Sequence, residues 1–131
     1  LGEAKIGYLT YPFDGPNRHP APGGGLFSTA SDVARFGQML ANGGTFEGKT
    51  YLSKEAIGEL TKRQTPATVK DSYGLGFAVW GSGFGHGGAC KTNLSVDRGL
   101  VRVFMVQQSN EWAKGNPEGE FSSEAMKVYR P

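Results

Sequence analysis

A short run of glycines around one histidine is the part of this sequence best suited to hold a ligand. Gly85-His86-Gly-Gly-Ala89 follows one segment with strand periodicity and precedes another. Glycines at such a point let a ligand lie against the backbone, with amide N–H groups free to donate hydrogen bonds to it. The imidazole of His86 can then hold the other end of the ligand. We therefore take His86, Gly87, Gly88 and Ala89 as candidate substrate-binding residues; the alternative is a glycine-rich turn that carries a surface histidine.

A second glycine-rich segment, Gly43 to Thr50, has the spacing of a phosphate-binding loop, including the lysine at Lys49. Such a loop leaves a buried strand and opens directly into a helix, whose N-terminal amides hold the phosphate. Here a predicted helix precedes the segment, and the cap of the next helix, Ser53, comes only after further residues. No apolar strand ending in aspartate is available for magnesium. We therefore predict a glycine-rich turn between two helices, and nucleotide binding stays a remote alternative.

The segment Gly83 to Gly88 also satisfies the six-residue glycine fingerprint of dinucleotide-binding folds, and it follows a predicted strand. That fingerprint requires a helix next, because the helix N-terminus binds the pyrophosphate. Residues 90–106 instead have the pattern of two further strands, so we reject the match. The glycosylation sequon Asn93-Leu-Ser95 lies inside a predicted strand and is interpreted as a chance occurrence.

Composition and charge argue against several classes of partner. The 131 residues are 37% hydrophobic and carry a net charge of +2, with acidic and basic residues interleaved. This distribution gives neither a basic stripe for nucleic acid nor an acidic tail. A single cysteine, Cys90, forms no internal disulfide, and two histidines far apart in sequence do not predict a zinc site. We expect no metal, no cofactor and no nucleic-acid partner, and no apolar run reaches the ~18 residues that span a membrane.

Two helices are expected in the first half of the chain. Residues 1–25 contain four prolines and are interpreted as an irregular or extended lead-in. Thr29-Ala-Ser-Asp32 has the form of a capping box, and it predicts a helix over about 30–42 that Asn42-Gly-Gly44 ends. A short hairpin or loop over Thr45–Leu52 follows. Ser53 then caps a second helix, which we expect to end near residue 63.

The second half of the chain has the hydrophobic pattern of strands. Period-two alternation predicts a strand over Tyr73–Trp80, and another runs through Leu94–Val96. Asp97-Arg-Gly99 forms a turn into Leu100–Val106, which is apolar on both faces. We therefore predict an α+β fold, with a three-stranded antiparallel meander packed with helices. Its last strand is expected to be central and covered on both sides, one cover being a C-terminal helix around Phe121–Val128.

The order of these segments resembles the serine β-lactamase and penicillin-binding-protein-like hydrolases, which include class C β-lactamases, esterases and D-alanyl-D-alanine carboxypeptidases. The resemblance covers about residues 20–110. The matching segments are Pro22-Gly-Gly-Gly-Leu26-Phe-Ser-Thr29-Ala-Ser-Asp32-Val-Ala-Arg-Phe36, Asn42-Gly-Gly, Tyr51-Leu-Ser53, Tyr73-Gly-Leu-Gly-Phe77, Gly85-His86-Gly-Gly-Ala89 and Val96-Asp97. In that family the position of His86-Gly-Gly88 is where Lys-Thr-Gly is often found, on the strand that lines the active site. His-x-Gly variants are familiar among its esterase and peptidase-like members.

The resemblance implies acyl transfer through a serine ester, with a Ser-x-x-Lys nucleophile, a tyrosine in proton transfer and this third motif. It makes His86 and Ala89 the catalytic candidates, with the backbone N–H of Ala89 completing an oxyanion hole. No serine of the chain has lysine three residues later, and Tyr51-Leu-Ser53 only imitates the tyrosine motif at a helix cap. Both missing motifs lie upstream in the family. We therefore expect a truncated piece of a larger enzyme, inactive by itself.

These observations predict that residues 1–131 are one C-terminal portion of a hydrolase domain, a fragment of the β-lactamase/transpeptidase-like fold. The lead-in and two helices occupy 1–66, and the sheet and C-terminal helix occupy 67–131. The expected partners are the missing N-terminal part of the same domain and a small-molecule or peptide substrate: a β-lactam, a D-Ala-D-Ala peptide or an ester. The resemblance suggests a periplasmic or extracytoplasmic location. The rival hypothesis is a non-catalytic binding or structural module with the same fold remnant.

Overall fold

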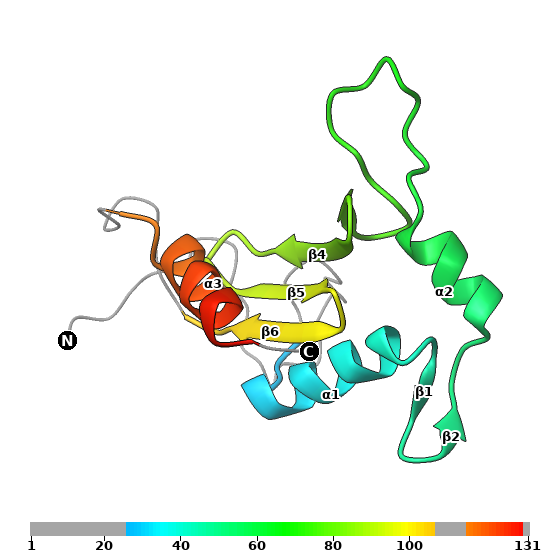
Figure 1. The fold of residues 1–131 in the computed structure, drawn as a ribbon, viewed down its shortest axis with the longest axis horizontal. Coiled ribbons are helices and arrows are strands. Elements are labelled where there is room, and N and C mark those ends of the chain that lie inside the picture. The colour runs from blue at the N-terminus through cyan, green and yellow to red at the C-terminus, as the bar shows by residue number, and fades with distance from the viewer. Residues whose placement is uncertain (1–25, 107–114, 130–131) are drawn as a thin grey trace, which may run out of the picture.

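The computed structural model describes residues 26–106 and 115–129, which form three helices and two antiparallel sheets (Figure 1). In chain order the elements are α1 (Ala30–Ala41), β1 (Thr45–Phe46), β2 (Lys49–Thr50), α2 (Lys54–Thr61), β3 (Ala78–Trp80), β4 (Gly83–Gly87), β5 (Asn93–Asp97), β6 (Leu100–Phe104) and α3 (Pro117–Val128). The larger sheet has the order β3-β4-β5-β6. The expected α+β class is confirmed, with one strand more than predicted. The lead-in expected for residues 1–25 lies outside the described residues.

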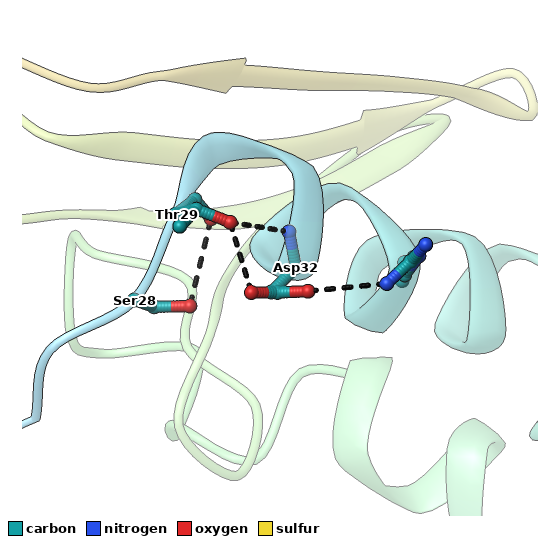
Figure 2. A network of polar contacts seen from close by, with 4 residues as sticks. Ser28, Thr29 and Asp32 are labelled. Atoms are coloured by element: carbon teal, nitrogen blue, oxygen red, sulfur yellow. Dashed lines mark hydrogen bonds and ion pairs between the residues drawn. The ribbon is translucent and has the colours of Figure 1, made fainter.

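Helix α1 begins at the predicted capping box (Figure 2). The Thr29 hydroxyl accepts a hydrogen bond from the Asp32 N–H at 3.1 Å and donates one to the Asp32 carboxylate at 2.9 Å. The same carboxylate forms an ion pair with Arg35 at 3.3 Å. The first turn of the helix is therefore fixed by side chains that are close together in sequence, which is why the pattern could be recognised.

The C-terminal end of α1 explains the two glycines that follow it. The N–H groups of Gly43 and Gly44 donate to the carbonyls of Leu40 and Met39 at 3.0 and 2.9 Å, which is the Schellman arrangement. Both glycines have a positive φ, of 68° and 98°. A Cβ on Gly44 would in addition collide with the Leu52 carbonyl. Only glycine therefore satisfies this helix end without strain.

The segment with phosphate-loop spacing is a β-hairpin. Strands β1 and β2 pair antiparallel, and Phe46 lies opposite Lys49. The two residues between them, Glu47 and Gly48, have φ of 48° and 76°, as in a type I′ turn. The predicted hairpin between two helices is thus confirmed, and Lys49 Nζ lies 4.8 Å from the centroid of the Tyr51 ring.

Helix α2 starts where the sequence predicts and ends slightly earlier. The Ser53 hydroxyl accepts a hydrogen bond from the Ala56 N–H at 3.1 Å, as an N-cap does. The helix ends at Thr61 rather than near Arg63, because the backbone of Lys62 is extended, with ψ 153°.

The additional strand, β4, is the glycine cluster itself. Its residues pair in register with β5, and Gly85 lies opposite Ser95. A Cβ on Gly85 would lie 2.5 Å from the Leu94 carbonyl oxygen, so the neighbouring strand is too close for any other residue. Glycine is unfavourable in strands, so the sequence pattern predicts a glycine-rich connection between two strands at this place and not a strand.

The strand predicted over Tyr73–Trp80 is only partly correct. Strand β3 begins at Ala78, and before it the chain reverses direction, so that Tyr73 pairs with Ala78 in an isolated bridge. Gly76 has a φ of 92° within this reversal. Glycines at alternate positions produced the period-two pattern and, at the same time, supplied the backbone freedom for a turn.

Strand β6 is covered on both faces as predicted, but its predicted central position is wrong, since it is the edge strand among the described residues. Helix α1 packs on one face, where a Cβ on Gly37 would lie 2.6 Å from Val101 Cγ1. Phe104 points to the opposite face, and its ring stacks on that of Phe121 in α3 at 5.4 Å. The predicted C-terminal helix is therefore present and contacts the sheet (Figure 1).

The buried core is small. Met39, Leu40 and Ile57 form a cluster that joins α1 to α2, and half-buried side chains from the hairpin and from strand β4 pack against it. In the larger sheet, Val96 is the buried hydrophobic residue. None of the helices within the described ranges is long and apolar enough to cross a bilayer.

Candidate functional site

The four residues selected from the sequence lie together at one end of β4. His86 and Gly87 are the last two residues of the strand, and Gly88 and Ala89 begin the loop to β5. All four are exposed. They form a short, accessible backbone segment at the end of the sheet.

The loop after β4 is a tight hairpin connection. The Gly88 N–H donates to the Thr92 carbonyl at 2.7 Å, and the Lys91 N–H donates to the Gly88 carbonyl at 3.0 Å. Lys91 has a φ of 68°, which is typical of a turn that closes with a left-handed residue. The backbone of Gly88 is therefore occupied by the loop. The Ala89 N–H, in contrast, has no hydrogen-bond partner within residues 26–106 and 115–129.

Among the described residues, one edge of β4 lacks a neighbouring strand at this point; we call it the open edge of β4. β3 pairs with Gly83–Gly85 and no further, whereas β5 pairs with the whole of β4. In an antiparallel pair the backbone groups of successive residues point alternately to the two sides. Since the Gly88 N–H donates to Thr92, the backbone N–H and C=O groups of the even-numbered residues point to β5. Those of the odd-numbered residues, including Gly87, point to the opposite, open edge. An extended ligand segment can pair with this edge as an additional strand would.

An aromatic side chain lies beside His86. The rings of Tyr73 and His86 are 6.1 Å apart between centroids and meet edge to face at 68°. Tyr73 comes from the chain reversal before β3 and is 38% exposed. The imidazole therefore has a phenol ring on one side and the open edge of β4 next to it.

Sequence reasoning did not assign Tyr73 or Thr92 to the site. The sequence places Tyr73 at the start of a predicted strand and in one of the segments that carry the family resemblance. Its contact with His86 depends on the chain reversal before β3, which the period-two pattern does not predict. Thr92 lies across the hairpin from Gly88, where a Cβ on Gly88 would collide with the Thr92 hydroxyl. Aligning residues 87–93 as a hairpin would have placed Thr92 opposite Gly88, so the sequence carried a weak indication of this contact.

Two carboxyl groups among the described residues have shifted pKa values. The pKa of Glu55 is lowered mainly by hydrogen bonding to its own backbone, and the pKa of Glu59 is lowered mainly by its hydrogen bond with Lys62. Both carboxyl groups are on α2. Within the described ranges, no group of three or more His, Cys, Asp or Glu side chains could hold a metal ion.

The exposed groups of this segment can bind a ligand. Among the described residues, the backbone N–H groups of Gly87 and Ala89 and the carbonyl of Gly87 are unpaired, and the imidazole of His86 lies beside them. Backbone N–H groups that point at a bound oxygen stabilise negative charge on it.

Comparison with protein families identifies one family for this chain. The Beta-lactamase family model matches residues 3–121 of the chain. Two curated Mycobacterium tuberculosis proteins, the uncharacterized protein MT1414 of strain CDC 1551 / Oshkosh and protein Rv1367c of strain ATCC 25618 / H37Rv, are each 45% identical to it over 76 residues. The matched region is 56% of this chain and 17% of each relative, so the chain spans less than a fifth of the length of these proteins.

Proposed function

Because this chain belongs to the Beta-lactamase family, whose model matches residues 3–121, we propose that it forms one wall of the active site of a serine hydrolase. The reaction is acyl transfer through a serine ester, and the substrate is a β-lactam, a D-Ala-D-Ala peptide or a simple ester. The observation that carries this proposal is the open edge of β4. There, Gly87 and Ala89 have free backbone groups directly beside His86.

Each residue of this wall has a distinct role. The Ala89 N–H donates to the oxyanion that forms when the substrate carbonyl is attacked, and a preorganised donor of this kind lowers the barrier. The backbone of Gly87 aligns the substrate along the edge, while Gly88 closes the loop that fixes Ala89. The imidazole of His86 hydrogen-bonds the substrate or the proton-transfer network, as the lysine of the family motif does.

The nucleophile is supplied by another part of the same domain. The sequence contains no Ser-x-x-Lys, so we propose that residues 1–131 are one C-terminal portion of the hydrolase domain and are inactive in isolation. The lack of a nucleophile is also the observation that favours the second candidate function, a non-catalytic module that binds a peptide at the open edge.

Covalent labelling separates these two functions. Incubated with a penicillin probe, the isolated chain should keep its intact mass, because it has no activated serine. A longer protein in which Ser-x-x-Lys precedes this chain should gain the mass of one acyl group, and replacement of that serine by alanine should abolish the gain. An adduct on the isolated chain would contradict the proposal that the nucleophile lies outside residues 1–131. A longer protein that neither forms an adduct nor hydrolyses an activated ester would support the binding module.

A further inference from the structure

Tyr73 reaches His86 from the base of a long surface loop. Helix α2 ends at Thr61, and the chain then runs through residues 62–72 before Tyr73 pairs with Ala78 (Figure 1). The Gln64 N–H donates to the Tyr73 carbonyl at 2.6 Å, so the two ends of the loop are held together. A loop whose ends are close and which is packed by its own side chains has the character of an Ω-loop.

One exposed guanidinium bridges several backbone carbonyls of this loop. Arg63 donates to the carbonyls of Thr65 and Pro66 at 3.0 Å each, and to the carbonyl of Val69 at 2.6 Å. Three backbone acceptors are thus bound to one rigid donor group, which fixes the course of the loop.

A second set of bonds fixes Tyr73 itself. The Thr65 hydroxyl donates to the Asp71 carbonyl at 2.8 Å and accepts from the Tyr73 N–H at 3.3 Å. The Thr65 N–H donates to the Tyr73 carbonyl at 3.3 Å. Both backbone groups of Tyr73 are therefore held by the loop, and the direction in which its side chain leaves the backbone is set.

The imidazole of His86 has few other restraints. It lies on an exposed strand position between Gly85 and Gly87, which have no side chains to limit its rotation. Within the described ranges, the imidazole makes one ring contact, the edge-to-face contact with Tyr73, and no hydrogen bond or ion pair. An exposed side chain of this kind populates several rotamers unless a neighbour selects one.

We propose that Tyr73 is a positioning residue: it selects the rotamer of His86 and forms the aromatic side of the candidate site. The effect of Tyr73 on catalysis rests on the function proposed above. The selection of the His86 rotamer by Tyr73 is independent of that function. The part of a substrate that lies beside His86 then also meets the phenol ring of Tyr73.

The first test is made on the 131-residue chain. NMR coupling constants and ring-to-ring Overhauser effects report the rotamers of His86 and its contact with Tyr73. Tyr73→Leu should change the ratio of His86 rotamers by about two- to twelve-fold, the range given by an aromatic pair. Tyr73→Phe should keep the wild-type ratio, because the ring remains. Tyr51→Leu, at an exposed tyrosine elsewhere, is the matched control. A His86 rotamer ratio unchanged in Tyr73→Leu would overturn the inference.

A second variant leaves both rings in place. Thr65→Val removes the hydroxyl that holds Tyr73 and should weaken the Overhauser effect between the Tyr73 and His86 rings. Thr61→Val is its control, since the Thr61 hydroxyl bonds the Ile57 carbonyl within α2. If both valine variants kept the wild-type Overhauser effect, the loop would not position Tyr73.

Activity then separates this inference from the proposed function. In a longer, active protein, Tyr73→Leu should lower kcat/KM by less than about ten-fold, and Tyr73→Phe should restore it. If His86→Ala kept the wild-type kcat/KM while Tyr73→Leu altered the rotamers, the catalytic role of His86 would fail and the positioning would stand. Unaltered rotamers reject the positioning, whatever the activity.

Discussion

At the scale of the residue, the candidate site depends on backbone groups that only small residues leave accessible. Among the described residues, the Ala89 N–H has no partner, because the hairpin loop is closed by the backbone groups of Gly88. The N–H and C=O of Gly87 point to the open edge, because β3 pairs only with Gly83–Gly85. Substitutions that alter these backbone groups should therefore affect catalysis more than substitutions of the same size elsewhere in the loop.

Ala89 gives the sharpest test at this scale. In a longer, active protein, Ala89→Pro removes the proposed oxyanion donor and should lower kcat by about 10²–10³. Ala89→Gly retains the N–H and should keep most of the activity. Steady-state kinetics measure both, and the circular dichroism spectrum checks that each variant folds. Equal kcat values for the two variants would remove Ala89 from the oxyanion hole.

At the scale of the element, two glycines of the helical region, Gly44 and Gly58, differ in what surrounds them. Gly44 ends α1 with a positive φ and lies against the Leu52 carbonyl, whereas a Cβ on Gly58, within α2, would meet no atom within 4 Å. The first glycine is required by geometry. The second only weakens its helix, because glycine has the larger backbone entropy in the unfolded chain.

Alanine substitutions should therefore have opposite signs at these positions. Gly44→Ala should lower the free energy of unfolding by more than about 1 kcal/mol, since it combines a strained φ with a collision. Gly58→Ala should raise it by about 0.5–1 kcal/mol. Urea unfolding of both variants gives the comparison. A loss of stability in Gly58→Ala would mean that this face of α2 is packed against something.

Two serines make a second pair at this scale. Ser53→Ala removes the N-cap of α2 and should cost about 1 kcal/mol of stability. Ser95 is 5% exposed in the middle of β5, and its buried hydroxyl has no hydrogen-bond partner within the described part of the chain. Ser95→Ala should therefore be neutral or stabilising, because a buried unpaired hydroxyl is unfavourable. The urea concentrations at the unfolding midpoints measure both changes in stability. A clear loss of stability in Ser95→Ala would indicate that the Ser95 hydroxyl has a hydrogen-bond partner.

At the scale of the whole molecule, the described residues leave much apolar surface uncovered. Leu26 is 88% exposed and Phe27 is 69% exposed, shortly before α1. Strand β6 is an edge strand within residues 26–106 and 115–129, and Met105, which follows it, is 40% exposed. Surface of this kind, together with an open and largely apolar strand edge, favours association with another polypeptide.

The isolated chain should therefore self-associate as its concentration rises. Sedimentation velocity over a range of concentrations measures this. Met105→Lys places a charge beside the β6 edge and should weaken the association, whereas Lys49→Met, at the distant β1–β2 hairpin, should leave it unchanged. A chain that stays monomeric at every concentration would show that its exposed apolar surface does not drive self-association.

The sequence determined the features that depend on neighbours along the chain. The caps at Thr29 and Ser53, the glycine end of α1, and the turn at Asp97–Gly99 were all predicted correctly, because each is made by residues a few positions apart. The ordered set of motifs was likewise sufficient to identify the family.

Only the tertiary structure decided the rest. That Gly83–Gly87 is a strand follows from the closeness of β5, which a weak local preference cannot indicate. The edge position of β6 depends on strand order, and the contact of Tyr73 with His86 depends on a chain reversal and on loop bonds from Thr65. The four candidate site residues could be proposed from the sequence because they are contiguous, and their role stays a prediction. The ring beside them was missed, because residues that are distant in sequence meet only when the chain folds.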